Sequence, residues 1–163
     1  MTVAQTINIR PAIQTDLEAM GRLGALLVRV HHDFDQARFI AATPETERGY
    51  AWFLGTQLEK PNVVLLVAER DGKVIAYSYA GAEGNDYMSL RGPAGVVYDI
   101  VVDPANRGQG VGSTLLEATL AALGSQGSHQ VVLSTAERNE TAQRLFARAG
   151  FRRTMIEMTK DIG

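Results

Sequence analysis

The amino-acid sequence predicts one domain of the α/β (α+β) class, in which helices pack on a single sheet. The chain has 163 residues, of which 45% are hydrophobic and 21% charged, and this composition is typical of a globular domain with one core. β-Rich runs and amphipathic helical runs follow one another in the order strand, two helices, three strands, helix, strand, helix, strand. No internal repeat or linker divides the chain. We therefore expect residues 1–163 to form a single domain, with its motif-bearing core at about residues 7–160.

The N-terminal segment predicts a short strand followed by an amphipathic helix. The strand is expected at Thr6–Arg10. Thr15 lies three residues before Glu18, which is the spacing of a capping box, so a helix is expected to begin here and to end near His31. The residues expected on its inward face are Leu17, Met20, Leu23, Leu27 and Val30.

A second helix and three strands are expected next. Thr43–Pro44 predicts an N-cap followed by proline at the first helical position, and the helix is expected to run to about Leu58. Residues 62–82 contain two β-rich runs joined at Asp71–Gly72, a dipeptide favoured in tight hairpin turns because these need positive φ. The next β-rich run, VVYDIVV, ends at Asp103–Pro104, because proline cannot donate to the ladder.

The last third of the chain predicts two more helices and two more strands. Residues 113–127 repeat apolar side chains at helical spacing and end in two glycines. Residues 129–136 form a β-rich run, and residues 139–150 form an amphipathic run with a glycine just past its end. Residues 151–162 are expected to close the chain as a strand.

Composition and charge exclude several classes of protein. The formal net charge is −2 and no polybasic block is present, so no nucleic-acid partner is expected. The chain has no cysteine, which excludes disulfides, thiolate zinc sites and a cysteine nucleophile. The N-terminal residues lack the pattern of a signal peptide, and no apolar run reaches the length of a membrane span. These features predict a cytoplasmic protein with no membrane partner.

One polar segment has a spacing that can hold a metal ion. His31 and Asp35 lie four residues apart in the segment HHDFD. The segment offers only two or three side chains that could bind a metal ion, and its other residues are typical of a surface loop. We interpret the segment as a polar rim, and no metal is expected.

Residues 104–114, PANRGQGVGST, predict a glycine-rich turn between a strand and a helix. Such a turn directs unpaired backbone N–H groups outward at the positive end of the helix dipole, a geometry that binds anions. A P-loop would need a lysine where this chain has Ser113. The dinucleotide fingerprint G-x-G-x-x-G is also broken, because its sixth position is Ser113 counted from Gly108 and Leu115 counted from Gly110.

Two motifs in the chain resemble signatures of one family. Arg107, Gly110 and Gly112 fit the pattern [RQ]-x-x-G-x-[GA], and residues 139–151, NETAQRLFARAGF, fit N-x-x-A-x-x-L-[YF]-x-x-x-G-F. With the opening IRPAIQTDL and the order of elements, nearly the whole chain resembles the GNAT superfamily of N-acetyltransferases. The resemblance implies the GNAT fold, a single mixed and mostly antiparallel sheet with splayed strands four and five, flanked by about four helices.

The resemblance also implies acetyl-CoA as a co-substrate. In this family the backbone amides of the glycine turn bind the CoA pyrophosphate, and the open edge of the fourth strand pairs with the pantetheine arm. Asn139 matches an asparagine that touches the pantetheine, and it is also a good helix N-cap. The residues expected to bind the co-substrate are Ile100, Val101, Val102, Arg107, Gly108, Gln109, Gly110, Val111, Gly112, Asn139 and Phe146.

The catalytic groups are less well defined than the co-substrate site. Phe146 stands where the family usually has a tyrosine that protonates the departing thiolate, and the lost acid costs roughly 1.4 kcal/mol at about pH 7.5, because the pKa of a thiol lies near 8.5. A proton acceptor for the amine is sought on the fourth strand, where alternation places Tyr98 and Asp99 on opposite faces. The resemblance favours Asp99, which could equally be a partly buried structural carboxylate.

The implied function is that of an acetyl-CoA-dependent N-acetyltransferase, an acyltransferase that moves the acetyl group directly to a primary amine of a small molecule or peptide. One alternative is a GNAT-fold acyl-CoA-binding sensor or partner module with little transferase activity, and a weaker one is another binder of nucleotide phosphates. The first helix-loop-helix and residues 81–95 are expected to determine the acceptor. The sequence does not decide between a monomer and a homodimer.

Overall fold

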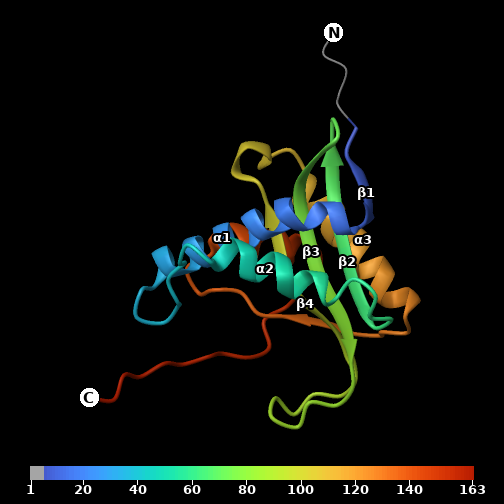
Figure 1. Ribbon diagram of the computed structural model, residues 1–163. Coiled ribbons are helices and arrows are strands. Elements are labelled where there is room, and N and C mark those ends of the chain that lie inside the picture. The colour runs from blue at the N-terminus through green and yellow to red at the C-terminus, as the bar shows by residue number, and fades with distance from the viewer. Residues whose placement is uncertain (1–5) are drawn as a thin grey trace.

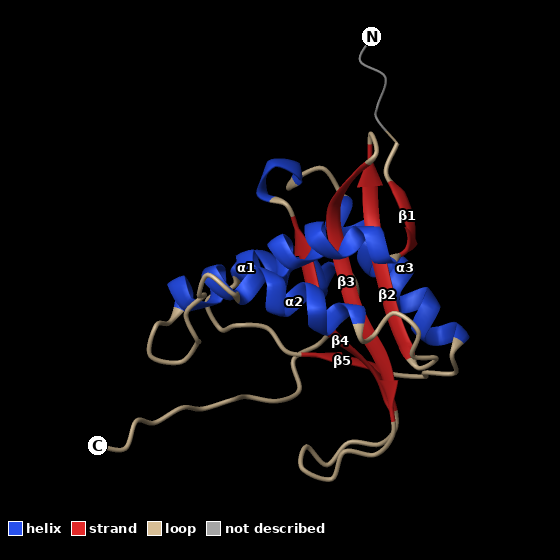
Figure 2. Ribbon diagram, in the orientation of Figure 1, coloured by secondary structure: helices blue, strands red, loops and turns tan. Residues whose placement is uncertain are grey.

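A computed structural model describes residues 6–163 and places one sheet between helices (Figures 1 and 2). Residues 1–5, part of the N-terminal stretch without a signal-peptide pattern, lie outside the described residues. In chain order the elements are β1 (Asn8–Pro11), the 3₁₀ helix η1 (Gln14–Asp16), α1 (Leu17–Phe34), α2 (Thr46–Gly55), β2 (Val63–Arg70), β3 (Lys73–Glu83), β4 (Ala94–Val102), the 3₁₀ helix η2 (Pro104–Asn106), α3 (Val111–Ser125), β5 (Val131–Leu133) and α4 (Glu140–Arg148).

The five strands form a mixed, mostly antiparallel sheet in the order β1-β2-β3-β4-β5. The first three pairings are antiparallel, and the β2–β3 hairpin turns at Asp71 and Gly72, whose φ angles of 51° and 73° confirm the predicted turn. The β4–β5 pairing is parallel and joins only Gly95–Val97 to Val131–Leu133. Past Val97, no strand within residues 6–163 lies beside the outer edge of β4, as the predicted splay requires.

The helices cover both faces of the sheet, with α1 and α2 on one side and α3 on the other (Figure 1). The core on the α1–α2 side is a cluster of large buried side chains, Leu17, Met20, Leu23, Leu54, Leu65, Val67, Tyr77 and Val101. The core on the α3 side contains Ala68, Ile75, Ala76, Val111 and Leu115. Both faces of the central strands are therefore apolar and buried.

A bulge in β3 lets two consecutive residues of that strand face α3. Ala76 lies opposite Ala68, but Val74 lies opposite Glu69, so Ile75 is an extra residue in β3. A bulge interrupts the alternation of side chains. As a result, Ile75 and Ala76 both join the core beside α3, and Tyr77 faces α1.

Two glycines of α1 allow α2 to pack unusually close. A Cβ atom at Gly21 would lie 2.5 Å from the backbone oxygen of Glu47, and one at Gly24 would lie 2.3 Å from the ring of Tyr50. Neither position accepts a larger side chain without moving α2. The glycines thus fix the place of α2 and of Tyr50.

The predicted capping box at Thr15 and Glu18 is wrong. The turn before α1 is held instead by the buried carboxylate of Asp16, which accepts the backbone N–H of Ile13 at 2.8 Å. Arg10 donates to both oxygens of Asp16, at 2.7 and 2.9 Å, so the carboxylate is neutralised where it is buried. Glu18 points outward and pairs with Arg22 at 3.1 Å.

Both ends of α2 also differ from the prediction by two or three residues. The helix begins at Thr46, two residues after Pro44, and ends at Gly55. Thr43 still acts locally, because its Oγ1 accepts the backbone N–H of Glu45 at 3.3 Å. The assigned end of a helix varies by a residue or two, and residues 56–59 continue α2 as turns, which accounts for the difference.

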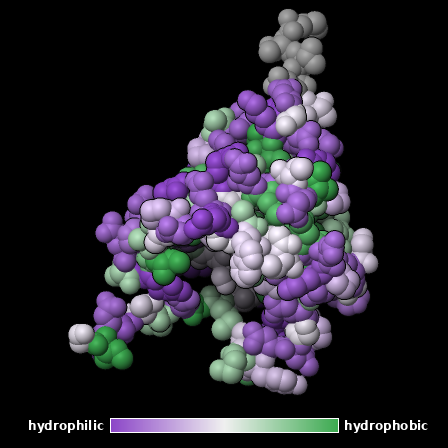
Figure 3. All heavy atoms as spheres, viewed as in Figure 1, coloured by the Kyte–Doolittle hydropathy of each residue, from purple (hydrophilic) through white to green (hydrophobic). Residues whose placement is uncertain are grey.

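The strand predicted at residues 151–162 is wrong. Residues 151–163 contain no helix or strand, and the segment leaves the body of the domain as an extended tail (Figures 1 and 3). A strand needs a partner edge as well as an apolar pattern, and β5, the outer strand on this side, is three residues long. An ion pair between Arg38 and Glu157 at 2.5 Å joins the tail to the loop after α1.

Candidate active site

A bulge in β4 brings the two predicted catalytic residues to one cavity. Tyr79 lies opposite Asp99, but Ala80 lies opposite Val97, so Tyr98 is an extra residue in β4. The bulge changes the alternation of side chains and turns the local strand. As a result, Tyr98 and Asp99 both line a cavity of about 460 Å³, and the prediction that they face opposite sides of the sheet is wrong.

The cavity lies between α2 and the α2-facing side of β3 and β4. Its lining residues are Thr46, Gly49, Tyr50, Phe53, Tyr79, Tyr98 and Asp99. The ring centroids of Tyr79 and Tyr98 are 4.7 Å apart with planes inclined by 36°, and Phe53 stands edge-on to Tyr79 at 5.8 Å. Tyr79 also donates its hydroxyl hydrogen to Gln57 at 3.3 Å. The walls are therefore mostly aromatic, and their positions are set by α2 and by the bulge.

Asp99 is the acidic group of this cavity. Its Oδ2 accepts a hydrogen bond from the hydroxyl of Tyr77 at 3.0 Å. Burial raises the pKa of Asp99 above its ordinary value, although the Tyr77 hydrogen bond and the nearby His31 act in the opposite direction. A carboxyl group with a raised pKa accepts a proton more readily than an ordinary aspartate.

The neighbouring phenols stay neutral at physiological pH. Burial, together with the charge of Asp99, raises the pKa of Tyr50 to about 12. The same two causes raise the pKa of Tyr77, whose side chain is fully buried, and of Tyr79. The cavity thus combines one titratable carboxyl group with hydroxyl groups that can only donate or accept hydrogen bonds.

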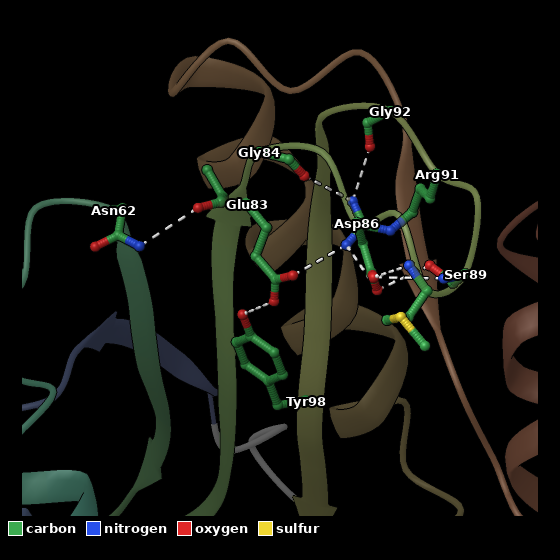
Figure 4. A network of polar contacts seen from close by, with 10 residues as sticks. Asn62, Glu83, Gly84, Asp86, Ser89, Arg91, Gly92 and Tyr98 are labelled. Atoms are coloured by element: carbon green, nitrogen blue, oxygen red, sulfur yellow. Dashed lines mark hydrogen bonds and ion pairs between the residues drawn. The ribbon is translucent and has the colours of Figure 1, made fainter.

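A polar network outside the cavity holds Tyr98 (Figure 4). The Tyr98 hydroxyl donates to Glu83 at the end of β3, and burial together with this bond raises the pKa of Tyr98. Glu83 in turn accepts from Arg91 at 2.9 Å, and Arg91 also lies 3.9 Å from Asp86. The β3–β4 loop, within residues 81–95, is therefore linked to the cavity through Tyr98.

The glycine-rich turn has the geometry expected of an anion site. Gly108 and Gly110 adopt φ angles of 72° and 79°, which glycine reaches without strain. The first backbone N–H groups of α3, a 15-residue helix, have no intrahelical acceptor, and its N-cap, Gly110, has no side chain that could accept from them. The positive end of the helix dipole adds to their attraction for an anion.

Side chains around the turn hold it in place. Arg70 at the end of β2 donates to the Gln109 side chain at 2.6 Å and to Asn106 at 3.2 Å. Arg107 donates from Nε to the backbone oxygen of Val102 at 3.2 Å. Arg70 was not predicted, because its link to the turn crosses from another strand and has no local sequence signal. The two guanidinium groups therefore bind oxygen atoms of residues 102–109, at the start of the turn.

The remaining predicted co-substrate residues lie around the end of β4. A Cβ atom at Gly112 would contact Leu145 of α4 at 3.4 Å and Val102 at 3.7 Å, so α3, α4 and the open edge of β4 converge here. Along this edge Val101 is buried, whereas Ile100 and Val102 are half-buried. A strand edge of this kind presents backbone donors and acceptors that an extended ligand can pair with.

Two residues of the α4 segment complete the set of predictions. Asn139 is the N-cap of α4, and its Oδ1 accepts the backbone N–H of Ala142 at 3.1 Å, which leaves its Nδ2 for other contacts. Phe146 is buried, and its ring packs against Phe151 with centroids 5.8 Å apart. At the position where the family that this sequence resembles usually has a tyrosine, the side chain of this protein therefore makes an apolar contact.

His31 makes its contacts within the domain. Nδ1 of His31 lies 2.8 Å from the backbone oxygen of Leu27, and its ring packs between Phe34 and Phe39. Within residues 6–163, no group of three or more His, Cys, Asp or Glu side chains is placed to hold a metal ion.

The part of the chain described by the structure also contains no helix both long and apolar enough to cross a membrane.

Sequence reasoning missed most of the cavity wall. Tyr50 and Phe53 come from α2, which has only a general amphipathic pattern, and Glu83 acts through Tyr98. The only sequence signal for them was the expectation that the first helix-loop-helix and residues 81–95 determine the acceptor. Tyr77 and Tyr79 lie two residues apart on β3 and have different roles near Asp99, because Tyr77 donates to its carboxylate and Tyr79 lines the cavity.

Comparisons with known proteins give a consistent relationship. The family model described as "Acetyltransferase (GNAT) family" matches residues 27–151. The chain is 41% identical over 96 residues to a mycothiol acetyltransferase of Thermobispora bispora, covering 56% of this chain and 31% of that protein. It is 27% identical over 145 residues to the uncharacterized N-acetyltransferase YhfO of Bacillus subtilis, covering 89% of each.

A solved structure adds a likeness of fold. The aminoglycoside N-acetyltransferase AAC(6')-Iy in complex with CoA matches with a TM-score of 0.76 at 17% sequence identity, covering 99% of this chain and 98% of that one. The chain spans about a third of the length of the mycothiol acetyltransferases that it matches, 31% and 35% in two of them.

Proposed function

This chain belongs to the acetyltransferase (GNAT) family, and on that premise we propose that it transfers an acetyl group from acetyl-CoA directly to a primary amine of a small molecule. This proposal rests on one observation, that a candidate anion site and a cavity with a carboxyl group lie along the same edge of β4. The uncapped N-terminus of α3 meets one end of the strand's open edge, and the cavity with Asp99 lies at the bulge farther along it. The relatives are named for mycothiol and aminoglycosides, which favours a small-molecule acceptor over a peptide.

The co-substrate is proposed to bind through main-chain atoms. Backbone N–H groups from Arg107 to Gly112 would hold the CoA pyrophosphate, with Arg70 and Arg107 supplying positive charge beside it. The pantetheine arm would pair with Ile100–Val102 as an added strand, with Asn139 Nδ2 on its other side. This path leads the thioester toward the bulge at Tyr98.

The reaction is proposed to proceed without a covalent enzyme intermediate, because the chain has no cysteine. The amine nitrogen attacks the acetyl carbon and forms a C–N bond, the carbonyl oxygen becomes an oxyanion, and the C–S bond then breaks to release CoA thiolate. The backbone N–H group of Tyr98, the extra residue of the β4 bulge, would stabilise the oxyanion. Asp99 takes the proton of the ammonium ion before the attack, and the second proton, which the nitrogen loses as the intermediate collapses, ends on the CoA thiolate.

A proton acceptor is the most demanding requirement of this step. An alkylamine with a pKa of about 10.4 must lose a proton at about pH 7, which costs roughly 4.6 kcal/mol. Asp99 is the proposed acceptor, because it lines the cavity and burial raises its pKa. The thiolate needs less help, roughly 1.4 kcal/mol, so the reaction can proceed although Phe146 stands where the family usually has a tyrosine.

A binding module that uses the same CoA site is the second candidate. Phe146 favours it, because an apolar side chain occupies the position of the family's usual acid. Such a protein would bind acetyl-CoA and respond to it without efficient transfer. The two candidates share the co-substrate site and differ only in turnover.

Release of CoA thiol in the presence of a panel of primary amines tests the proposal. We expect saturable, amine-dependent release, with the acetylated amine detected by mass spectrometry in equal amount. Binding of acetyl-CoA without turnover of any amine would overturn the transferase and support the binding module. If CoA does not raise the unfolding temperature while NAD or ATP does, the co-substrate assignment itself is wrong.

A further inference from the structure

We propose that the cavity beside Asp99 selects a primary amine that carries one positive charge joined to a flat apolar group, that is, a monocationic arylalkylamine. The inference rests on the proposed function and names the acceptor class for the same site. It is carried by the composition of the cavity wall, in which aromatic rings surround a single carboxylate.

Four aromatic rings form most of the wall. Tyr50 and Phe53 come from α2, Tyr79 from β3 and Tyr98 from the bulge in β4. Phe53 and Tyr98 keep 42% and 41% of their surface exposed, which leaves broad ring surface for a ligand. Rings inclined to one another at 4.7 and 5.8 Å can receive a planar apolar group by stacking or edge contact. Their faces also attract an ammonium ion.

The charge inside the cavity is that of one carboxylate. Of the described residues that line the cavity, Asp99 is the one with a charged side chain. Its Oδ2 is engaged by Tyr77, and no bond to its Oδ1 is present within residues 6–163, so Oδ1 can face a ligand. Glu83 lies nearby, but its carboxylate accepts from Tyr98 and Arg91 and is compensated there. One ammonium group therefore balances the site.

A polycation would not be balanced in the same way. A second or third ammonium group entering the cavity would lose water without gaining a carboxylate, because the other lining side chains are aromatic, hydroxyl or glycine. Polyamines and aminoglycosides carry several such groups. A single ammonium on a short chain with an apolar ring matches both the charge and the wall.

The same pairing favours the chemical step. Proton transfer from the ammonium to Asp99 converts an ion pair into a neutral amine and a neutral acid. The burial of Asp99 disfavours its ionised form and so favours this neutral pair, and the same burial raises its pKa. Asp99 would thus orient the cation first and accept its proton afterwards.

Steady-state acetylation of matched amines tests the selectivity. The probes are 2-phenylethylamine as a monocationic arylalkylamine, spermidine as a polyamine and kanamycin as an aminoglycoside. We expect kcat/KM for 2-phenylethylamine to exceed that of the other two by at least about tenfold. A higher kcat/KM for spermidine or kanamycin would overturn the inference and leave the proposed transferase intact.

Two adjacent residues on α2 provide a matched pair of variants. Phe53→Leu removes a ring from the wall and keeps an apolar side chain, so KM for 2-phenylethylamine should rise by about fivefold, the loss of one cation–π or stacking contact. Trp52→Leu removes a ring that is 71% exposed and does not line the cavity, so KM should stay unchanged. Equal effects of the two substitutions would contradict an aromatic acceptor site.

Calorimetric titration of the CoA-bound protein with 2-phenylethylamine separates the two proposals if no amine turns over. Saturable binding that Phe53→Leu weakens and Trp52→Leu leaves unchanged would uphold the amine site while the transferase fails. No saturable binding of 2-phenylethylamine would overturn the inference.

Discussion

Replacing Gly110 or Gly112 with alanine separates the dihedral angles of the phosphate turn from the space around it. Gly110 has a φ of 79° and open space where a Cβ atom would stand, so Gly110→Ala meets backbone strain without a steric clash. Left-handed backbone at a residue with a Cβ costs about 1–2 kcal/mol. Gly112 has no positive φ, and its Cβ would make ordinary contacts at 3.4 and 3.7 Å.

The two substitutions should therefore differ in stability. For a domain of this size, 1 kcal/mol corresponds to a shift of roughly 2–4 °C, so Gly110→Ala should lower the unfolding temperature by about 2–8 °C. Gly112→Ala lies in the first turn of α3, where alanine is favoured over glycine by up to about 1 kcal/mol. Its unfolding temperature should equal or slightly exceed that of the wild type.

The same pair should differ in CoA affinity. If the Gly110→Ala variant relaxes its strain by leaving the left-handed region, at least one N–H group turns away from the phosphate, and a hydrogen bond to a charged group is worth about 1.5–3 kcal/mol. Calorimetric titration should then show Kd for CoA raised by at least about tenfold in Gly110→Ala and changed by less than about threefold in Gly112→Ala. Wild-type affinity in Gly110→Ala, or an equal loss in both, would refute the assignment of the site to main-chain geometry.

Three further substitutions test the charges and the apolar contact around the site. Asp99→Asn should abolish transfer and raise the unfolding temperature at about pH 8, because burial raises the pKa of Asp99 and so makes its ionised form costly in the folded state. The gain in unfolding temperature should shrink as the pH falls through that pKa. A gain that grows toward acidic pH would contradict the direction of the pKa shift. Asp16→Asn should destabilise the fold by about 2 kcal/mol near pH 7, because Arg10 lowers the pKa of a carboxyl group that is 6% exposed. Thermal unfolding should show that the difference in stability between variant and wild type shrinks as the pH falls below about 4. A difference that does not change with pH would rule out the ion pair as its source. Phe146→Tyr should leave Kd for CoA unchanged and raise kcat by up to about tenfold if a missing acid limits the rate, whereas a lower kcat would show that the contact with Phe151 needs an apolar ring.

The sequence predicted the parts of the fold whose signals are local. The Asp71–Gly72 hairpin, the stop at Pro104 and the turn into α3 each depend on backbone preferences of a few consecutive residues. The inward positions Leu17, Met20 and Leu23 followed from helical periodicity and are buried. The two family motifs reinforced these local signals, because they fixed the order of elements on which the fold depends.

The features that were missed depend on contacts between distant segments. Tyr98 and Asp99 share a cavity because β4 has one more residue than β3 at this point, and such a bulge has no signal in the pattern VVYDIVV. The last segment has a strand-like pattern, but β5 offers it only a three-residue edge. The aromatic wall contributed by Tyr50 and Phe53 depends on how closely α2 packs against α1.

A crystal structure of the chain with CoA and 2-phenylethylamine tests most directly whether the turn at α3 and the aromatic cavity form one active site. We predict pyrophosphate oxygens within hydrogen-bond distance of backbone N–H groups between Gly108 and Gly112, and the pantetheine arm along the open edge of β4. The sulfur atom should then lie at the bulge, with the amine nitrogen beside Asp99 and its ring between Phe53 and Tyr98. CoA bound away from the N-terminus of α3, or an amine bound away from Asp99, would contradict this arrangement.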